Sequence, residues 1–188
     1  KTSLLKDLLT KSKNISISVS HTTRESRMGE VNGQDYHFVG KNTFHNLIEE
    51  GDFLEHAEVF GNYYGTSQSA VKKQLAAGED VILEIDWQGA EQVRRLMPEA
   101  VSIFILPPSR GALLERLQGR GQDSDDIIKG RMDQAVSEMS HYGEFDYIVV
   151  NDVFESALLE LKSIFEAGRL TTKRQSQEHM AMISQLLK

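Results

Sequence analysis

Hydroxyl and guanidinium side chains gather in one polar segment near the N-terminus of this chain. The segment runs from Ser18 to Tyr36 and contains Ser20. It also contains Arg24 and Arg27, three residues apart. Hydroxyl donors and guanidinium groups provide the hydrogen bonds and the positive charge that a phosphate dianion needs. The whole chain has a net charge of −7, so this local positive charge indicates a small phosphorylated ligand rather than a nucleic-acid surface. The alternative is a solvent-exposed turn with scattered charges.

A second group of polar side chains lies in or next to predicted short strands. Glu55 does not suit a phosphate, but its carboxylate can accept two parallel N–H donors, which matches N1–H and the exocyclic amine of guanine. Thr66 could offer a hydroxyl to the same base. Tyr36 and Tyr64 could each donate a phenol hydroxyl to a phosphate. The alternative is a surface strand that carries a charge.

Two carboxylates, Glu84 and Asp86, lie at the carboxyl end of an apolar strand predicted over residues 81–85. Ligands of open α/β sheets bind at this edge, and an aspartate there can hold Mg²⁺ directly or through water. The alternative is that Glu84 forms an internal ion pair and that Asp86 caps the next helix.

Two more motifs indicate nucleotide chemistry only in combination with the others. Lys1-Thr2 opens a helix, as the end of a P-loop does, where the lysine reaches the β- and γ-phosphates and the hydroxyl binds Mg²⁺. By itself such a pair is an ordinary surface pair. Arg116, Arg120 and Arg131 flank a segment rich in Gly, Asp and Ser, the composition of a lid that closes over a triphosphate. Such arginines also occur in surface ion pairs.

Apolar strands alternate with helices over most of the chain, which predicts a parallel sheet covered on both faces. Residues 20–78 interrupt this pattern with short strands, so we expect them to form an inserted subdomain. Helices are predicted over residues 2–13, 41–50, 67–77, 88–96, 111–117, 127–142 and 156–167, and strands over 15–19, 36–39, 53–60, 62–65, 81–85, 101–106 and 147–150.

The composition limits the class of protein. There is no cysteine, which excludes disulfides and thiolate metal sites and fits a reducing cytoplasm. No apolar run reaches the ~18–20 residues of a membrane span, and the net charge of −7 argues against nucleic-acid or membrane-surface binding, so we expect neither membrane nor nucleic-acid partners. The apolar positions between Arg169 and Lys188 have helical spacing and fit either the chain's own core or a second subunit, which leaves a homo-oligomer open.

Taken together, the motifs closely resemble the guanylate kinase family from Lys1 to about residue 165, and the tail from Arg169 resembles the bacterial members. The most specific matches are Ser18–Arg24, Arg27–Phe38, Gly61–Thr66, Ile82–Asp86 and Gly119–Gly121.

The resemblance implies an α/β P-loop nucleoside-monophosphate kinase fold. Its parallel-sheet core would comprise residues 1–19 and 79–188, its mixed α/β GMP-binding subdomain residues 20–78, and its lid residues 119–131. The reaction would transfer the γ-phosphate of ATP to GMP or dGMP, with Mg²⁺, in the cytoplasm. Family members carry a first strand and a glycine-rich P-loop segment before the position of Lys1. We therefore expect the natural protein to be longer than this sequence and the core sheet seen here to have a gap.

The resemblance also implies a role for each site residue. GMP would be bound by Ser20, Arg24, Arg27, Tyr36, Glu55, Tyr64, Thr66, Glu84 and Asp86, ATP by Lys1, Thr2, Ser3, Arg120, Arg131 and Asn151, and Mg²⁺ by Thr2 and Asp86. The charge of the transferred group would be stabilised by Lys1, Arg24, Arg27, Arg120 and Arg131.

Two alternatives stay open. One is a catalytically inactive guanylate-kinase-like binding module, against which the presence of Lys1 and Ser20 argues. The other is a different small-phosphate kinase on the same fold, against which Glu55 and Thr66 argue.

Overall fold

The computed structural model describes residues 1–59, 61–119 and 125–188. The chain forms two compact units, which are described one at a time. The first comprises Lys1–Ser12, Phe104–Met132 and Tyr147–Lys188, and the second comprises Lys13–Ile103 and Asp133–Asp146.

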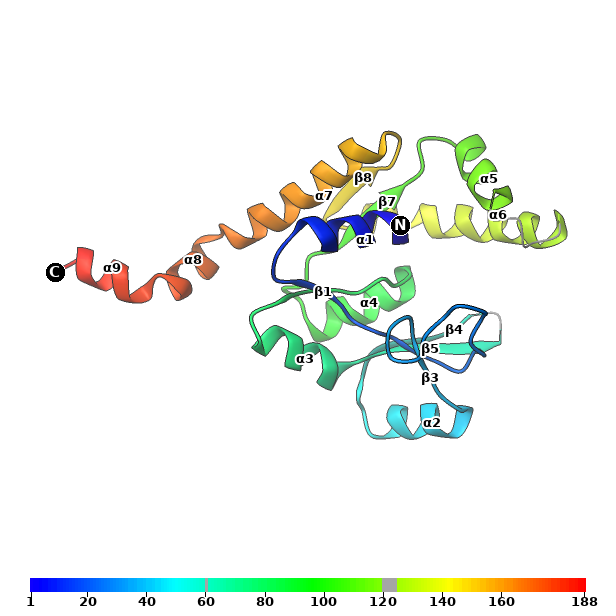
Figure 1. The fold of residues 1–188 in the computed structure, drawn as a ribbon, viewed down its shortest axis with the longest axis horizontal. Helices are drawn as coiled ribbons and strands as arrows, with labels where there is room; N and C mark the ends of the chain where they lie inside the picture. Colours follow the sequence, from blue (N-terminus) through cyan, green and yellow to red (C-terminus); the bar gives the residue numbers. More distant parts are fainter. Residues whose placement is uncertain (60, 120–124) are drawn as a thin grey trace. The chain divides into compact units, whose positions relative to one another are not determined.

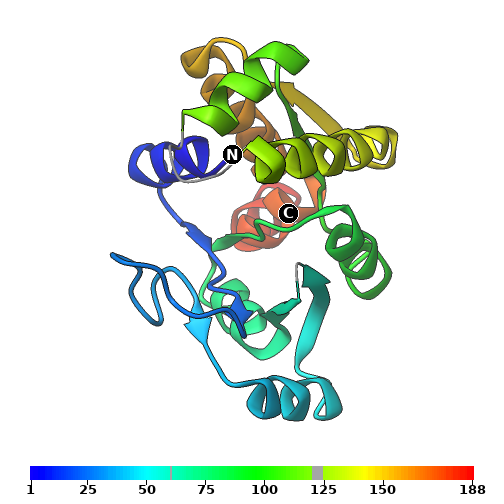
Figure 2. The same ribbon diagram turned by 90° about the vertical axis from the view of Figure 1, so that its right-hand side faces the viewer.

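The second unit contains a four-stranded mixed sheet in the order β3-β2-β5-β4. β2 runs parallel to β3 and antiparallel to β5, and β4 and β5 are antiparallel neighbours. The connection between β2 and β3 leaves the strands as a long irregular loop, drawn in blue in Figure 2. The strands are β2 (His21–Thr22), β3 (His37–Phe38), β4 (Phe53–Val59) and β5 (Asn62–Ser67).

Aromatic packing joins this sheet to helix α2 (Lys41–Glu49). Phe44 of α2 is fully buried, and its ring centroid lies 4.6 Å from that of Phe53 in β4. Gly65 leaves room for both rings, because a Cβ there would lie 3.0 Å from the Phe53 ring and 3.1 Å from Phe44. The polar loop and β4 are therefore carried by one compact layer.

A second layer of this unit is built on β1 (Ile15–Ile17), which pairs in parallel with β6 (Asp80–Ile82). Helix α3 (Gln68–Ala76) begins with Ser67 as its N-cap, and helix α4 (Trp87–Leu96) packs against β4. The buried side chains between these elements are Leu54, Val71 and Val93, with Val81, Leu83, Ile85, Met97 and Ala100 packed around them.

The first unit contains a two-stranded sheet of β7 and β8. Helix α1 buries Leu4, Leu5 and Leu8 and packs beside α7, as Figure 1 shows. The elements are α1 (Thr2–Lys11), β7 (Ile103–Leu106), α5 (Arg110–Gln118), α6 (Asp125–Ser140), β8 (Tyr147–Val150), α7 (Phe154–Arg169), α8 (Thr172–Glu178) and α9 (Met180–Leu186); α6 continues into the second unit, where η1 (Tyr142–Glu144) follows it.

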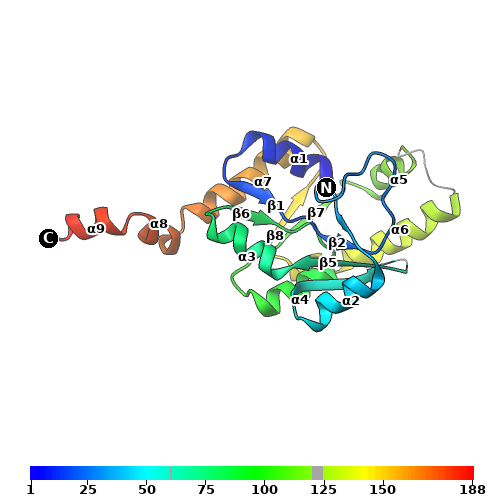
Figure 3. The same ribbon diagram turned by 60° about the horizontal axis from the view of Figure 1, so that its bottom comes forward.

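The predicted elements agree with the observed ones apart from their ends. Several predicted strands are shorter than expected: 15–19 becomes 15–17, 36–39 becomes 37–38, 81–85 becomes 80–82 and 101–106 becomes 103–106. In the described part of the chain the core strands pair as two separate sheets, β1 with β6 and β7 with β8 (Figure 3). The predicted boundaries of core, subdomain and lid stay a prediction. Across the described ranges, no helix combines the length and the apolar character that crossing a membrane requires.

Candidate functional site

A buried carboxylate lies between β4 and β5. Glu55 and Thr66 are directly opposite each other in the antiparallel ladder, and their side chains are 5% and 0% exposed. Thr66 Oγ1 donates a hydrogen bond of 2.5 Å to Glu55 Oε1. Burial raises the pKa of Glu55 from 4.5 to about 7, against the opposite effect of the Thr66 hydrogen bond. The two residues that the sequence predicted as base readers are therefore in direct contact.

Ser20 adjoins this pair rather than standing apart from it. Its Oγ lies 3.4 Å from Thr66 Oγ1. Because Thr66 gives its single hydroxyl proton to Glu55, Ser20 is the donor in this long contact. Two hydroxyls and one carboxylate thus form a chain that connects the start of the polar loop to β4.

Helix α4 approaches the same carboxylate so closely that a side chain at one position would displace it. A Cβ on Gly89 would lie 2.8 Å from Glu55 Oε2 and 3.3 Å from Ile85 Cβ. The sequence analysis missed Gly89, although a glycine inside a helical pattern is the signal that could have drawn attention to it. Ser20, Glu55, Thr66, Asp86 and Gly89 are called the carboxylate cluster below.

Asp86 is the N-cap of α4, since its Oδ1 accepts a 2.8 Å hydrogen bond from the Gly89 N–H. This is the helix-capping alternative that the sequence left open. The negative charge of Asp86 is close enough to raise the pKa of Glu55 further, after the larger effect of burial. Glu84 is exposed, and its charge contributes to the raised pKa of Tyr36, which burial and Tyr64 raise more.

Arg24 is held by a carboxylate that the sequence analysis did not single out. Its Nη1 and Nη2 donate to Glu30 Oε2 and Oε1 at 3.0 and 2.8 Å, and Nη1 also donates to the Glu25 carbonyl at 2.6 Å. The hydrogen bonds that Arg24 donates to Glu30 are the main cause of the raised pKa of Arg24. An acidic residue six positions after an arginine gives no sequence signal of this pairing, because the turn between them brings them together. Residues 23–36 are called the arginine loop below.

Aromatic rings surround the same guanidinium. Arg24 Cζ lies 5.5 Å from the Tyr36 ring centroid and 5.7 Å from that of Phe38. Tyr36 and Tyr64 meet edge to face, with their centroids 6.0 Å apart. Arg27 has an exposed side chain, and its backbone N–H donates to Glu30 Oε2 at 2.7 Å. The structure therefore brings Arg24, Tyr36 and Tyr64 together, with Arg27 in the adjoining turn.

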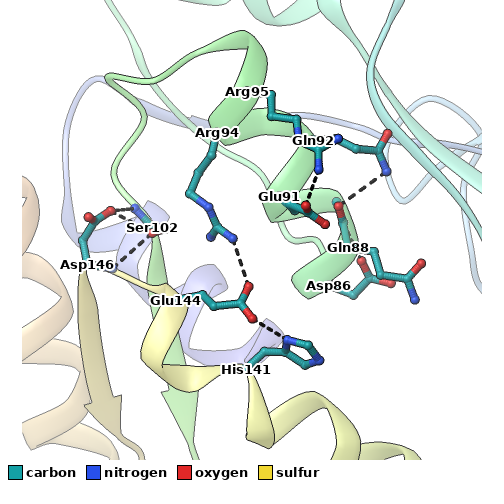
Figure 4. A network of polar contacts seen from close by, with 11 residues as sticks. Asp86, Gln88, Glu91, Gln92, Arg94, Arg95, Ser102, His141, Glu144 and Asp146 are labelled. Carbon is teal, nitrogen blue, oxygen red and sulfur yellow. Dashed lines mark hydrogen bonds and ion pairs between the residues drawn. The ribbon is translucent and has the colours of Figure 1, made fainter.

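Polar contacts, drawn in Figure 4, connect α4 to residues that follow α6. Arg94 donates to Glu144 at 3.2 Å, and Glu144 contacts His141 Nδ1 at 2.6 Å. The His141 ring stacks on Trp87 with their centroids 3.6 Å apart. Asp146 accepts hydrogen bonds from the backbone and hydroxyl of Ser102. These contacts hold the helix that carries Asp86 and Gly89.

The first unit holds the residues predicted to bind ATP. Lys1 precedes α1, and its carbonyl accepts the Leu5 N–H at 3.2 Å. Thr2 and Ser3 are exposed in the first turn of the helix, opposite its buried leucines. Their side chains therefore lie at the surface at the start of α1.

Two further predicted residues of this unit lie elsewhere along the chain. The backbone N–H of Asn151 donates to the Leu106 carbonyl at 2.8 Å, and its own carbonyl accepts from Arg116 Nη2 at 2.9 Å. Arg131 is half-buried on α6. Arg120, predicted for the lid, lies outside the described residues, as do the next four positions.

The described residues form no group of three or more His, Asp or Glu side chains that could hold a metal ion. Proteins commonly hold Mg²⁺ beside nucleotides through one or two protein oxygens plus substrate phosphates. The Thr2 hydroxyl and the Asp86 carboxylate are chemically suitable oxygens, although Asp86 already uses one oxygen as a helix cap.

Comparison with known proteins gives a consistent result. The family model of guanylate kinase matches residues 1–168. Guanylate kinase of Pseudomonas fluorescens strain Pf-5 is 60% identical over 187 residues, which is 100% of this chain and 91% of that protein. Guanylate kinase of Escherichia coli K12 is 60% identical over 171 residues, which is 91% of this chain and 83% of the relative.

A solved structure supports the same assignment. The crystal structure of guanylate kinase from Anaplasma phagocytophilum matches with a TM-score of 0.78 and 37% identity, over 92% of this chain and 84% of that one. Its similarity confirms the predicted α/β P-loop kinase fold. On fold, sequence and the arrangement of its polar residues, this chain belongs to the guanylate kinase family.

Proposed function

We propose that this chain transfers the γ-phosphoryl group of ATP to GMP, or to dGMP, giving ADP and the nucleoside diphosphate. Family membership and the relatives named above support the reaction. The observation that carries the proposal is the Glu55 carboxylate. It is buried, it receives hydrogen bonds only from Thr66 among the described residues, and it lies one hydroxyl away from the segment that bears Arg24.

Guanine is the base that such a carboxylate recognises. The two Glu55 oxygens can accept N1–H and the exocyclic amine in parallel, and Thr66 orients the carboxylate and offers its own oxygen. Adenine presents an unprotonated N1 at the same edge, so it would place an acceptor against an acceptor. A buried site built for donors rejects a base that lacks them.

The GMP phosphate is assigned to the arginine loop. Arg24 and Arg27 supply positive charge, and Tyr36 and Tyr64 supply hydroxyl donors beside Arg24. Ser20, three residues before this loop, keeps its predicted role in binding the phosphate. These donors orient the acceptor oxygen and offset its negative charge, which is most of what a protein contributes to phosphoryl transfer.

The transfer itself needs no covalent enzyme intermediate. An oxygen of the GMP phosphate forms a bond to the γ-phosphorus, and the bond from that phosphorus to the β,γ-bridging oxygen breaks, so ADP leaves with the electron pair. Lys1 with Arg120 and Arg131 is proposed to stabilise the charge on the transferred group, and Ser3 and Asn151 to contact ATP. Thr2 and Asp86 would hold Mg²⁺, which would supply positive charge against the ATP phosphates.

Water must be kept from the γ-phosphate during the reaction, because otherwise ATP would be hydrolysed. We propose that the lid over residues 119–131 has this role. We also propose a cytoplasmic location, in keeping with the absence of cysteine.

Neither alternative from the sequence gains support. Each relative named above is called a guanylate kinase, which does not favour an inactive binding module. A kinase for a ligand without a base would have no use for a buried carboxylate that faces a threonine hydroxyl.

The test is a coupled assay for ADP formation from ATP and Mg²⁺ with GMP, dGMP, AMP, UMP or no acceptor, on the protein with any residues that precede Lys1 included. We expect turnover with GMP and dGMP and at most trace turnover with the others. Folded protein that binds GMP without turnover would instead support the binding module.

A further inference from the structure

We infer that Glu30 is a positioning residue for the GMP phosphate: it holds the Arg24 guanidinium so that the edge directed away from Glu30 meets the phosphate. The inference rests on the proposed function, because the phosphate in question is that of GMP. The arrangement that supports it is the two-point contact between Arg24 and Glu30 within the arginine loop.

The contact determines which edge of the guanidinium remains for a ligand. Glu30 binds Nη1 and Nη2, which form the end of the planar group, at 3.0 and 2.8 Å. An arginine has five N–H donors in a rigid fork, so an end-on pair leaves the side edge, formed by Nε and the second hydrogen of Nη2, unoccupied by Glu30. Tyr64 also hydrogen-bonds the Arg24 side chain, so a ligand oxyanion would meet Arg24 and the Tyr64 hydroxyl together. The side chains of Arg24 and Glu30 are 16% and 20% exposed, so both groups are partly shielded from water.

Glu30 is itself held in place by the turn in which it lies. Its Oε2 accepts the Arg27 N–H at 2.7 Å, and its own N–H donates to the Arg27 carbonyl at 3.1 Å. One carboxylate therefore connects Arg24 to the backbone of Arg27, the other arginine of the loop. The rings of Tyr36 and Phe38 limit the guanidinium from another side.

Two effects of Glu30 on phosphate binding oppose each other. Its negative charge repels a phosphate dianion, and its hydrogen bonds order a long side chain before the ligand arrives. A free arginine loses considerable rotamer freedom when it is immobilised, so prior ordering raises affinity. Because the Glu30 charge is already paired with Arg24 at hydrogen-bond distance, ordering is the larger effect. Removing the pair should then weaken GMP binding rather than strengthen it.

The first experiment is Glu30→Gln. A glutamine keeps one oxygen that can accept the Arg27 N–H, but its amide group cannot receive both Arg24 donors. We expect KM and Kd for GMP to rise about tenfold, in the range seen when partners of ligand-binding groups are removed elsewhere. The change in kcat should be smaller. Binding of guanosine, which has no phosphate, should stay unchanged, a result that general damage to the fold would not produce.

Two further variants isolate the path through Arg24. In an Arg24→Ala background, Glu30→Gln should have little additional effect on GMP affinity, because its partner is already gone. The matched control is Asp35→Asn. The Asp35 carboxylate accepts the Val31 N–H at 2.8 Å in the same loop, and replacing it should leave GMP affinity unchanged.

Several results would overturn the inference. Tighter GMP binding by Glu30→Gln would make Glu30 a competitor for Arg24, and unchanged binding would make it irrelevant. Equal losses for GMP and guanosine, or additive effects with Arg24→Ala, would indicate a general structural role. If Glu30→Gln does not fold, Glu30→Asp takes its place and should raise Kd for GMP but not for guanosine. A wild-type protein that neither binds nor phosphorylates GMP would refute the proposed function instead.

Discussion

The carboxylate cluster and the arginine loop belong to the same compact unit, but they handle charge in opposite ways. Glu55 is 5% exposed, and within the described ranges its carboxylate receives hydrogen bonds from Thr66 alone, so burial moves its pKa up to about 7. Glu30 stands beside two arginines, and the hydrogen bonds from Arg24 move its pKa below the usual value. The negative charge of Glu55 therefore has few hydrogen-bond donors around it, whereas that of Glu30 is paired with Arg24.

This difference suggests that the carboxylate cluster gives selectivity for the base, whereas the arginine loop adds affinity for the phosphate. A buried acceptor without enough donors gains most from a ligand that supplies them, so the carboxylate cluster should decide which base binds. A paired guanidinium near the surface gains less from each contact but attracts any phosphate. The predictions below each perturb one region and use the other as a reference.

The largest effect is expected from Glu55→Gln. The amide can no longer accept both N–H donors of guanine, and its own N–H group would face one of them. We expect kcat/KM for GMP to fall about 10²- to 10³-fold and the preference for GMP over AMP to shrink by a similar factor. The measurement is kcat/KM with each nucleotide. Glu58→Gln, at an exposed position of the same strand, is the control and should change neither value.

An unchanged preference for GMP over AMP in Glu55→Gln would refute the role of this residue. Phosphate-dependent binding should survive the substitution, because the arginine loop is intact. Inorganic phosphate or ribose 5-phosphate should therefore bind the variant and the wild type alike.

The second expected effect is a dependence on pH. Only ionised Glu55 accepts both guanine donors, and its pKa in the free protein is about 7. Guanosine should therefore bind about tenfold more weakly at pH 6 than at pH 8, with release of about one proton at the lower pH. Guanosine is the suitable ligand because the phosphate of GMP titrates near pH 6 itself. Calorimetry in two buffers of different ionisation enthalpy measures the proton.

The raised pKa of Glu55 also affects the stability of the fold. Guanosine binding should strengthen as the pH rises, whereas the contribution of Glu55 to stability should fall. The folded state favours protonated Glu55, so the stabilisation is complete below pH 4.5 and is lost as the pH rises through about 7. Glu55→Gln should remove this dependence from the free energy of unfolding. A wild-type protein whose guanosine affinity is flat between pH 6 and 8 would contradict both statements.

The sequence predicted the carboxylate cluster better than the contacts that support it. Glu55 and Thr66 could be grouped in advance because both suit the donors of a guanine base, and the antiparallel ladder places them opposite each other. Asp86 could be anticipated as a helix cap because capping is local. The guanidinium partner Glu30 depends on how a glycine-rich loop folds back, which no periodicity encodes.

The role of Gly89 could not be predicted from the sequence either, because it depends on tertiary packing. Its importance comes from the distance between α4 and β4, elements that are far apart in the sequence. The ATP-binding assignments of Lys1, Thr2, Ser3, Arg131 and Asn151 rest on the family resemblance, since their roles depend on a ligand rather than on neighbours within the chain.

The third expected effect is that of Gly89→Ala. The added methyl group would lie 2.8 Å from Glu55 Oε2, and the end of the glutamate can move away from it. The fold should therefore survive, and alanine even favours the helix by up to about 1 kcal/mol, while the carboxylate leaves its position. We expect kcat/KM for GMP to fall about fivefold to tenfold.

The control is Gly111→Ala in the first turn of α5, where the nearest atom to a new Cβ is Ser109 Oγ at 3.7 Å. This substitution should leave the kinetics unchanged. If Gly89→Ala had wild-type kinetics as well, close approach of α4 would not be needed to position Glu55.

The smallest expected effect is that of salt, and it bears on the comparison most directly. Raising NaCl from 0.1 to 1 M shortens the screening length from about 10 to about 3 Å, which weakens exposed charge interactions more than buried ones. Arg24 and Glu30 are partly exposed, whereas Glu55 and Thr66 are not. GMP affinity should fall about threefold. Guanosine affinity should change by less than about 1.5-fold. Calorimetric titrations of both ligands at both salt concentrations provide the test. If guanosine lost as much affinity as GMP, the carboxylate cluster would also be open to screening, and burial could not be the source of its selectivity.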